Sequence, residues 1–561
     1  MKKLMALALV LAMLAALLAG CGAGGETDGN KGETAAQSGN SDDTGEKVKL
    51  TVGISQNTLV EDYETNSYIK WLEEQTGYDI EVQLYAASSA DANTQLSVAL
   101  LDESSQLPDM LLDFRGLGAA TWRMYGEDGY FVPLTDYFED RDGVAKPWYD
   151  RLEEIGVEEG TIKQILLAAS ANDSEVYAFP TLEFGSLDNM DYAVHMNQTW
   201  LDELNLEMPS DPESLYEVLK AFKAAHPNSY PLVGLKTTQL SGDVISWLLN
   251  MFGYSDDTKY LTLSEDGKTV GTNFTSDAYR EGLEYCHKLY SEGLLYITTR
   301  PELTSLVNVS DEEMSVGCFV GHPSLVLEAN NPCIYNYVAC PIWGYAVVNE
   351  NARRYANFIT EAAAANGTVD ACWNLLMTMC SKESSYRQRY GEYGTDWEWA
   401  DEGAVSLTGA AAEIKVLNPT AISSVGNNCL KVVCGTILNN CENEATQISD
   451  DMGEWEAYRS KLQSQQYEYF YAAAKKNPKY IWPSITLTDV ERDEINDTVT
   501  NCKEYIQQYR LSFVNGEGGI DPSNDNNWNA YVKGLEDAGL SRWIEKYQEV
   551  YNERYIDTVI G

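Results

Sequence analysis

Residues 48–54 read Val-Lys-Leu-Thr-Val-Gly-Ile, and apolar and polar side chains alternate along them as they do in a half-buried strand. The same alternation returns at 79–85, and a short apolar strand is expected at 110–112. Helices are expected between these strands, over about 66–75 and about 93–101. The order strand, helix, strand, helix, strand predicts an α/β fold with a mostly parallel sheet that carries helices on its faces.

Ligands of such sheets bind beyond the carboxyl ends of the strands. Gln56 and Asn57 directly follow the first predicted strand, and Asp113 and Arg115 follow the third. Their amide, carboxylate and guanidinium groups form hydrogen bonds readily with a polar ligand. We therefore expect these four residues to line a ligand site. For Arg115 the alternative is a salt bridge at a hinge.

The last third of the chain is expected to be helical. A capping box of Thr488 and Glu491 opens a stretch in which apolar residues recur at helical spacing as far as Phe513. Another amphipathic helix begins at Trp455, and two more follow, separated by Gly539. The sequence thus changes from alternating strands and helices to helices alone.

The first residues have the pattern of an export signal. Met1-Lys2-Lys3 is followed by apolar residues from Leu4 to Leu18, a run that is short for a membrane span of about 20 residues. Leu18-Ala19-Gly20-Cys21 then matches the lipobox of bacterial lipoproteins. This match implies a signal peptide over 1–20 and a lipid on the thiol of Cys21. The alternative is an uncleaved signal followed by an unmodified cysteine.

The segment after the lipobox predicts a tether. Residues 22–46 contain no Val, Ile, Leu, Met or aromatic residue, so they bury too little apolar surface to offset the entropy of ordering. We expect 21–47 to be a flexible anchor segment that spans about 25–30 Å root-mean-square. No later apolar run reaches spanning length. The folded part is therefore expected at the extracellular face of the cell membrane, held there by lipid alone.

The charge balance narrows the choice of ligand. Across 561 residues there are 86 acidic and 39 basic side chains, which gives a net charge of −47. So acidic a surface repels phosphate backbones and anionic lipid headgroups, which argues against nucleic-acid binding and electrostatic membrane docking. We therefore expect a ligand that is neutral or cationic.

Ten cysteines follow Cys21. Their even number in an exported protein permits disulfides, although a chain of this size does not depend on them. The candidate local group is Cys429, Cys434 and Cys441. The alternative is that most of the ten are buried thiols.

Several short motifs, each weak alone, occur in an order that resembles one protein family. They are Leu107-Pro108-Asp109, GYFVPLTD at 129–136, YAFP at 177–180, NQTWLDELNL at 197–206, LKAFK at 219–223, YSEGL at 290–294, YGEYGTDW at 390–397 and FVNG at 513–516. With the lipobox, they make the chain similar to extracellular solute-binding proteins of carbohydrate ABC importers, family 1-like and of the large Gram-positive lipoprotein type. The resemblance covers nearly the whole chain.

This resemblance implies a two-lobed α/β fold of the periplasmic-binding-protein type (type II, Venus-flytrap), in which the ligand lies in a cleft between the lobes. The boundaries that it implies place lobe 1 at 48–182 and 352–420, and lobe 2 at 183–351 and 421–561. It also implies the family's usual task, delivery of an oligosaccharide to a membrane permease. Peptides and other solutes are alternatives, because a fold does not name its ligand.

Catalytic signatures are missing from the sequence. The four histidines form no HExxH motif, and no GxSxG, Walker or GxGxxG motif is present. We therefore expect a monomeric binding protein with no metal and no cofactor, rather than an enzyme. A surface glycoside-processing enzyme is the rival of another class and would need two close carboxylates. A sensor that signals to a membrane kinase is a third reading.

Aromatic residues supply further ligand candidates, because 36 Tyr and 13 Trp far outnumber 12 Phe. A ring with a polar group can lie against the C–H face of a sugar while nearby polar side chains bind its hydroxyls. The further candidates are Trp122, Glu183 beside the implied hinge, Trp247, His322, Trp343 and Trp397. For each aromatic residue the alternative is a place in the core, and for Trp397 packing is the particular alternative because its motif is characteristic of the family.

Overall fold

The computed structural model describes residues 47–561 apart from short internal segments. These are 103–104, 185–192, 236–242, 257–258, 322–325, 329–330, 348–351, 407–408, 419–425, 431–436, 440–445 and 448–453. The expected signal peptide, Cys21 and the tether therefore lie outside the described residues. Within the described ranges, no helix is long and apolar enough to cross a membrane.

The first sheet has six strands in the order β15-β4-β12-β3-β1-β2. They are β1 (Lys49–Ser55), β2 (Asp79–Tyr85), β3 (Met110–Leu112), β4 (Phe179–Phe184), β12 (Ala352–Ile359) and β15 (Ile437–Asn439). β1 pairs in parallel with β2 and β3, which confirms the three predicted strands. β12 runs antiparallel to β3 and β4, so the sheet is mixed where the chain returns through it.

Helices accompany this sheet as predicted. They are α2 (Ser67–Thr76), α3 (Ser89–Leu101), α4 (Ala119–Glu127), α5 (Thr135–Glu139), α6 (Lys146–Glu154), α7 (Glu159–Ala169), α14 (Glu361–Asn366), α15 (Val369–Met379) and α16 (Lys382–Tyr390). α2 begins where the Asn66 side chain accepts backbone N–H bonds, and it ends at Gly77, whose φ of 74° suits glycine. Phe138 packs edge-on against Trp148 and Trp373, with ring centroids 5.0 and 5.1 Å away, in the first core.

The second sheet has five strands in the order β11-β5-β10-β6-β9. They are β5 (Val194–Asn197), β6 (Tyr230–Leu235), β9 (Leu295–Thr298), β10 (Val316–Val320) and β11 (Tyr337–Ala339). Its helices are α8 (Gln198–Glu203), α9 (Pro212–Ala225), α10 (Val244–Leu249), α11 (Asp277–Ser291) and α12 (Arg300–Val307), and a ribbon of β7 (Thr262–Leu263) and β8 (Val270–Gly271) lies between α10 and α11 in sequence. Parallel pairing of β6 with β9 and β10 gives this sheet its α/β character as well.

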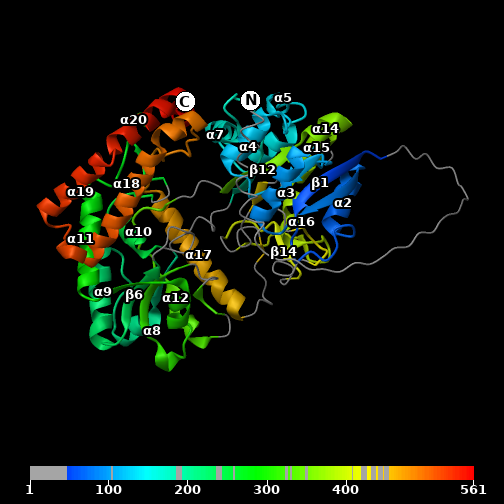
Figure 1. Cartoon of the computed structure of the whole chain (residues 1–561). Helices are drawn as coiled ribbons and strands as arrows, with labels where there is room; N and C mark the ends of the chain where they lie inside the picture. The colour runs from blue at the N-terminus through cyan, green and yellow to red at the C-terminus, as the bar shows by residue number, and fades with distance from the viewer. Residues whose placement is uncertain are drawn as a thin grey trace, which may run out of the picture. The chain divides into compact units, whose positions relative to one another are not determined.

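The carboxyl-terminal third is helical, as predicted. It contains α17 (Glu454–Ala474), α18 (Asp489–Asn515), α19 (Asp525–Asp537), α20 (Leu540–Val550), a π-helical turn (Tyr551–Tyr555) and α21 (Ile556–Val559). The capping box at Thr488 and Glu491 is present, and Gly539 separates α19 from α20 with a φ of 107°. In Figure 1 α18 lies beside α11, and the buried pair Arg510–Asp243, 3.2 Å apart, joins α18 to the start of α10.

One strand departs from the implied lobe boundaries. β15 lies beyond residue 420, in the part that the boundaries assign to lobe 2, yet it pairs in parallel with β4 of the first sheet. Its register joins Ile437 to Leu182 and Asn439 to Phe184. The backbone hydrogen bonds of this pair extend the first sheet past the boundary, which local sequence patterns do not reveal.

Eight cysteines lie in the described ranges and all are buried, while Cys434 and Cys441 fall outside them. Six of the eight are free thiols: Cys286, Cys318, Cys333, Cys340, Cys372 and Cys502. Burial raises the pKa of Cys340 and of Cys372 to about 12. These thiols therefore stay protonated at neutral pH and serve as apolar packing groups.

Candidate ligand site

A hollow of about 380 Å³ lies at the carboxyl ends of β1, β2 and β3. It is lined by Ser55, Gln56, Asn57, Thr58, Ala87, Ser89, Leu112, Asp113 and Arg115. The structure thus brings together all four residues that the strand-end argument selected. Gln56 also lines a neighbouring hollow of about 640 Å³ beside β1, β2 and α2, so the two hollows share one side chain.

Hydrogen bonds that involve two other strands, β12 and β4, hold the turn at Asp113 in place. Asp113 has a φ of 51°, and its backbone N–H donates a 2.9 Å hydrogen bond to Oδ1 of Asn357 in β12. The amide nitrogen of Asn357 donates to the backbone oxygen of Phe179 at 3.0 Å and to the hydroxyl of Thr181 at 2.8 Å, both in β4. Asn357 is completely buried. Asn357 was not predicted from the sequence, since nothing local links it to a turn 244 residues earlier.

Asp113 and Arg115 form a bidentate ion pair. Nε and Nη2 of Arg115 each donate a 2.7 Å hydrogen bond to one carboxylate oxygen. The Asp113 side chain is 8% exposed and that of Arg115 is 45% exposed, so the guanidinium faces solvent. Two parallel bonds fix the orientation of the guanidinium plane, and the opposite charges cancel. The hollow therefore presents directed polar groups with little net charge, which suits a neutral polar ligand.

The loop that follows β1 is tied to residues 426–429. The backbone N–H of Ser67 donates to the oxygen of Asn427 at 2.7 Å, and Nδ2 of Asn66 donates to the oxygen of Cys429 at 3.0 Å. In the same segment Nδ2 of Asn428 donates a 2.7 Å bond to the buried carboxylate of Asp396. The motif at 390–397 is thereby connected to the loop that carries Gln56 and Asn57.

Two aromatic rings, one within this motif and one just after it, are open to solvent. Trp399 ends β13 (Trp397–Trp399), which pairs with β14 (Ile414–Val416), and Trp399 and Tyr393 are each 42% exposed. Their ring centroids lie 6.4 Å apart, and the buried ring of Trp397 supports Trp399 from 5.2 Å at 88°. An exposed Trp and Tyr side by side offer apolar faces with polar edges, which is the surface that a sugar ring packs against.

Known proteins of similar sequence include a transport protein and a lipoprotein. The chain is 23% identical over 496 residues to the fructooligosaccharide ABC transporter substrate-binding protein FusA of Streptococcus pneumoniae, with 86% of each chain covered. It is also 27% identical over 233 residues to lipoprotein LipO of Bacillus subtilis, with 40% of this chain and 41% of that one covered. No protein-family model matches the chain.

Solved structures agree with these relatives. A solute-binding protein from Bifidobacterium longum infantis, described as binding HMO and associated with an ABC transporter, superimposes with a TM-score of 0.65 at 19% identity. The superposition covers 91% of this chain and 99% of that one. This chain has the two-lobed solute-binding protein fold. The resemblance inferred from the sequence is confirmed at this level.

The other sequence candidates lie elsewhere in this solute-binding fold. Trp122 and Trp247 are each 2% exposed, and Trp343 and Trp397 are also buried, so their rings pack in cores and none of them lines the strand-end hollow as described. Their indole nitrogens support packing: Nε1 of Trp247 donates to the oxygen of Ile342 at 3.3 Å, and that of Trp397 to the oxygen of Gly391 at 3.0 Å. For these four residues the structure favours the packing alternative.

Two further candidates remain expectations. Glu183 lies in β4, where its backbone pairs with Ala352 and Leu438, but its side chain is outside the description. His322 lies outside the described residues, within the segment 322–325 that follows β10. Within the described ranges, no group of three or more His, Cys, Asp or Glu side chains is placed to hold a metal ion.

Proposed function

We propose that this chain is the substrate-binding component of an ABC importer and that its ligand is a neutral oligosaccharide. The hollow at the ends of β1 and β3, with its charge-cancelled Asp113–Arg115 pair, is the observation that carries the proposal. The substrate description of FusA points to the same class of ligand. The permease would then receive the sugar from the closed form of the protein.

In this proposal Gln56, Asn57, Asp113 and Arg115 bind sugar hydroxyls, and Trp399 and Tyr393 pack against ring faces. Contacts with both lobes would stabilise the closed state, because a ligand shifts an equilibrium only through its different affinity for the two states. Lipid on Cys21 would hold the protein at the outer face of the membrane, and two hollows that share Gln56 leave room for several sugar units.

Calorimetry on the chain without its first 21 residues tests the proposal. The panel contains neutral fructo-, malto-, xylo- and galacto-oligosaccharides of two to six units, and a mixture of short peptides is the comparison. We expect saturable binding of at least one oligosaccharide series, with affinity rising from two units to four. Binding of peptides and of no sugar would contradict the proposal, and so would steady hydrolysis of the bound sugar.

The anchor is tested separately in the full-length chain. Cells that express the wild type should incorporate a radioactive or clickable fatty acid into the protein, and the Cys21→Ala variant should incorporate none. Equal labelling of both proteins would contradict the proposed attachment site.

A further inference from the structure

A second polar site lies away from the strand-end hollow, between helices of the first lobe and the carboxyl-terminal helices. Two hollows, of about 420 and 120 Å³, share Arg123, Thr486 and Leu487 in their linings. The larger hollow is lined by residues of α4, α7, β12, α18 and α20. The smaller hollow is lined by residues of α4, α7 and the π-helical turn Tyr551–Tyr555, and by the segments after α7 and before α18. Of the lining residues that the structure describes, neither hollow shares one with the strand-end hollow.

The linings of these two hollows have an unusual charge. Among the residues that the structure describes, they contain Arg123, Arg492, Lys503 and Arg554, and no aspartate or glutamate. The chain as a whole has 86 acidic and 39 basic residues and is strongly negative. The charged side chains described in this cavity are all positive, so the cavity has the opposite sign of charge to the protein around it. We call these four side chains and their hollows the cationic pocket.

Two of the four cations are already neutralised by carboxylates behind them. Arg492 forms an ion pair with Asp489, and Nη2 of Arg554 lies 2.6 Å from Glu491. Nε of Arg554 is buried and has no hydrogen-bond partner in the described part of the chain. The charge of the pocket therefore comes from the other two side chains.

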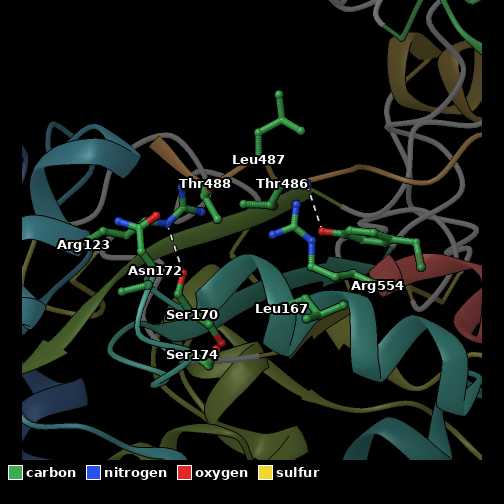
Figure 2. Close-up of a pocket in the computed structure, with 11 residues that line it drawn as sticks. Arg123, Leu167, Ser170, Asn172, Ser174, Thr486, Leu487, Thr488 and Arg554 are labelled. Atoms are coloured by element: carbon green, nitrogen blue, oxygen red, sulfur yellow. Dashed lines mark hydrogen bonds between the residues drawn. The ribbon is translucent and has the colours of Figure 1, made fainter. Parts of the chain in front are cut away.

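Arg123 and Lys503 form no ion pair with a carboxylate of the described residues. Nε of Arg123 donates to the backbone oxygen of Ser170 at 3.0 Å, as Figure 2 shows, and its guanidinium lies 5.0 Å from the ring of Trp122. Arg123 is 4% exposed. Burial lowers the pKa of this guanidinium, and the charge of Arg492 lowers it further while that of Asp489 opposes the shift.

Lys503 is held in a similar way, without a counter-charge. Its Nζ lies 5.2 Å from the ring centroid of Tyr260 and 5.8 Å from that of Trp543. Burial lowers the pKa of Lys503. Taking a cation out of water without an opposite charge is costly, for the buried Arg123 and in part for the half-buried Lys503, and an anion bound beside them would offset that cost.

We propose that the cationic pocket binds a small oxyanion, either inorganic phosphate or the carboxylate of a sugar acid of monosaccharide size. Arg123 and Lys503 supply the charge, and the pocket's hydroxyl and amide side chains, such as Thr488 and Asn496, supply further hydrogen bonds. The anion bridges α4 on one side and α18 on the other. It thereby adds a link between these elements, close to the hydrogen bonds of 3.2 and 3.3 Å that Asn172, in the segment after α7, exchanges with Asp489 of α18.

This proposal does not rest on the oligosaccharide assignment, because the two sites have no described lining residue in common. The test uses the same chain from residue 22, in Tris buffer at constant ionic strength set with sodium chloride. Sodium phosphate, sodium glucuronate and neutral glucose are titrated separately by calorimetry and by thermal unfolding. Phosphate and glucuronate distinguish the inorganic from the organic source of the oxyanion, and glucose controls for sugar binding without charge.

The variants are Lys503→Gln and Arg123→Gln, with Lys533→Gln as a matched control. Lys533 is an exposed lysine on α19 whose ion pair with Asp537 is at the surface, so its loss removes one charge away from the pocket. We expect one saturable site for phosphate or glucuronate in the wild type and in Lys533→Gln. Affinity should fall at least tenfold in Lys503→Gln and in Arg123→Gln.

Two results would overturn the proposal: no saturable binding of either anion, or equal binding in wild type and Lys503→Gln. Should Arg123→Gln fail to fold, the half-buried Lys503 still decides the outcome, because its side chain makes no hydrogen bond in the described part of the chain. Oligosaccharide affinity, measured on the same samples, should be retained in Lys503→Gln.

Discussion

Replacing Asn357 by alanine tests how the structure positions the proposed sugar site. The Asn357 side chain accepts one hydrogen bond from the Asp113 backbone and donates two to β4, all between 2.8 and 3.0 Å. Its removal takes one hydrogen bond from each of three polar groups in a buried region. At about 1 kcal/mol for each hydrogen bond lost, the free energy of unfolding should fall by about 3 kcal/mol.

The same substitution should weaken sugar binding, although Asn357 is buried and touches no ligand in the proposal. Asp113 holds a positive φ, and without the bond from its N–H to Asn357 the turn can relax and carry Arg115 with it. We expect the dissociation constant of the best oligosaccharide to rise at least tenfold, about 1.4 kcal/mol. Urea unfolding gives the stability, and calorimetry at a temperature where the variant is folded gives the affinity.

Asn366→Ala is the matched control. Nδ2 of Asn366 donates a 2.9 Å bond to Asp109, next to the same sheet, but it makes no bond to Asp113. This control should lose some stability and keep the wild-type affinity. If Asn357→Ala loses stability but binds sugar as tightly as the wild type, the argument that Asn357 positions Asp113 is refuted.

Three other substitutions test separate parts of the account. Trp399→Ala should weaken sugar binding about tenfold, or about 1.4 kcal/mol, in calorimetry, with an unchanged melting temperature because the ring is exposed. Arg510→Met should lower the free energy of unfolding by about 3–5 kcal/mol in urea titrations, since it removes the cation that forms an ion pair with the buried carboxylate of Asp243, and adding Asp243→Asn should recover part of the loss. Burial alone would raise the pKa of Glu491, but hydrogen bonds from Arg554 and the helix cap keep this pKa below its ordinary 4.5. The stability that this carboxylate contributes is therefore complete above pH 4.5 and is lost as the pH falls through the lowered pKa. Glu491→Gln should thus make the melting temperature depend less on pH in the acid range, and an unchanged dependence would contradict this.

Local patterns predicted the elements that depend on local physics. The strand at 49–55 follows from alternating side chains, and the start of α18 follows from the Thr488 capping box. The strand-end rule also placed Gln56 and Asp113 at one hollow, since parallel strands bring their carboxyl ends to the same edge. β15 escaped prediction because its three residues become a strand only through pairing with β4.

Individual aromatic residues were harder to assign. Trp397 and Trp399 lie two residues apart on one short strand, and their sequence context is nearly the same. Only the packing of Tyr386 and Tyr390 around Trp397 decides that Trp397 is buried and that Trp399 is the exposed ring. The choice depends on contacts with α16 and β14, which one-dimensional periodicity does not contain.

The net charge of −47 also takes on a more specific meaning. The negative charge of the whole surface led us to expect a neutral or cationic ligand. The Asp113–Arg115 pair at the strand-end hollow, whose charges cancel, agrees with that expectation. The cationic pocket is a local exception, lined by α4, α7 and β12 on one side and by carboxyl-terminal helices on the other. A single average charge therefore describes the surface of this protein better than it describes its cavities.

A crystal structure of the chain from residue 22 with a bound neutral tetrasaccharide tests the central claim most directly. The account predicts sugar hydroxyls within hydrogen-bond distance of Asp113 or Arg115, beside Gln56 and Asn57, with a sugar ring packed on Trp399. A tetrasaccharide bound elsewhere, with none of these side chains in contact, would contradict the account.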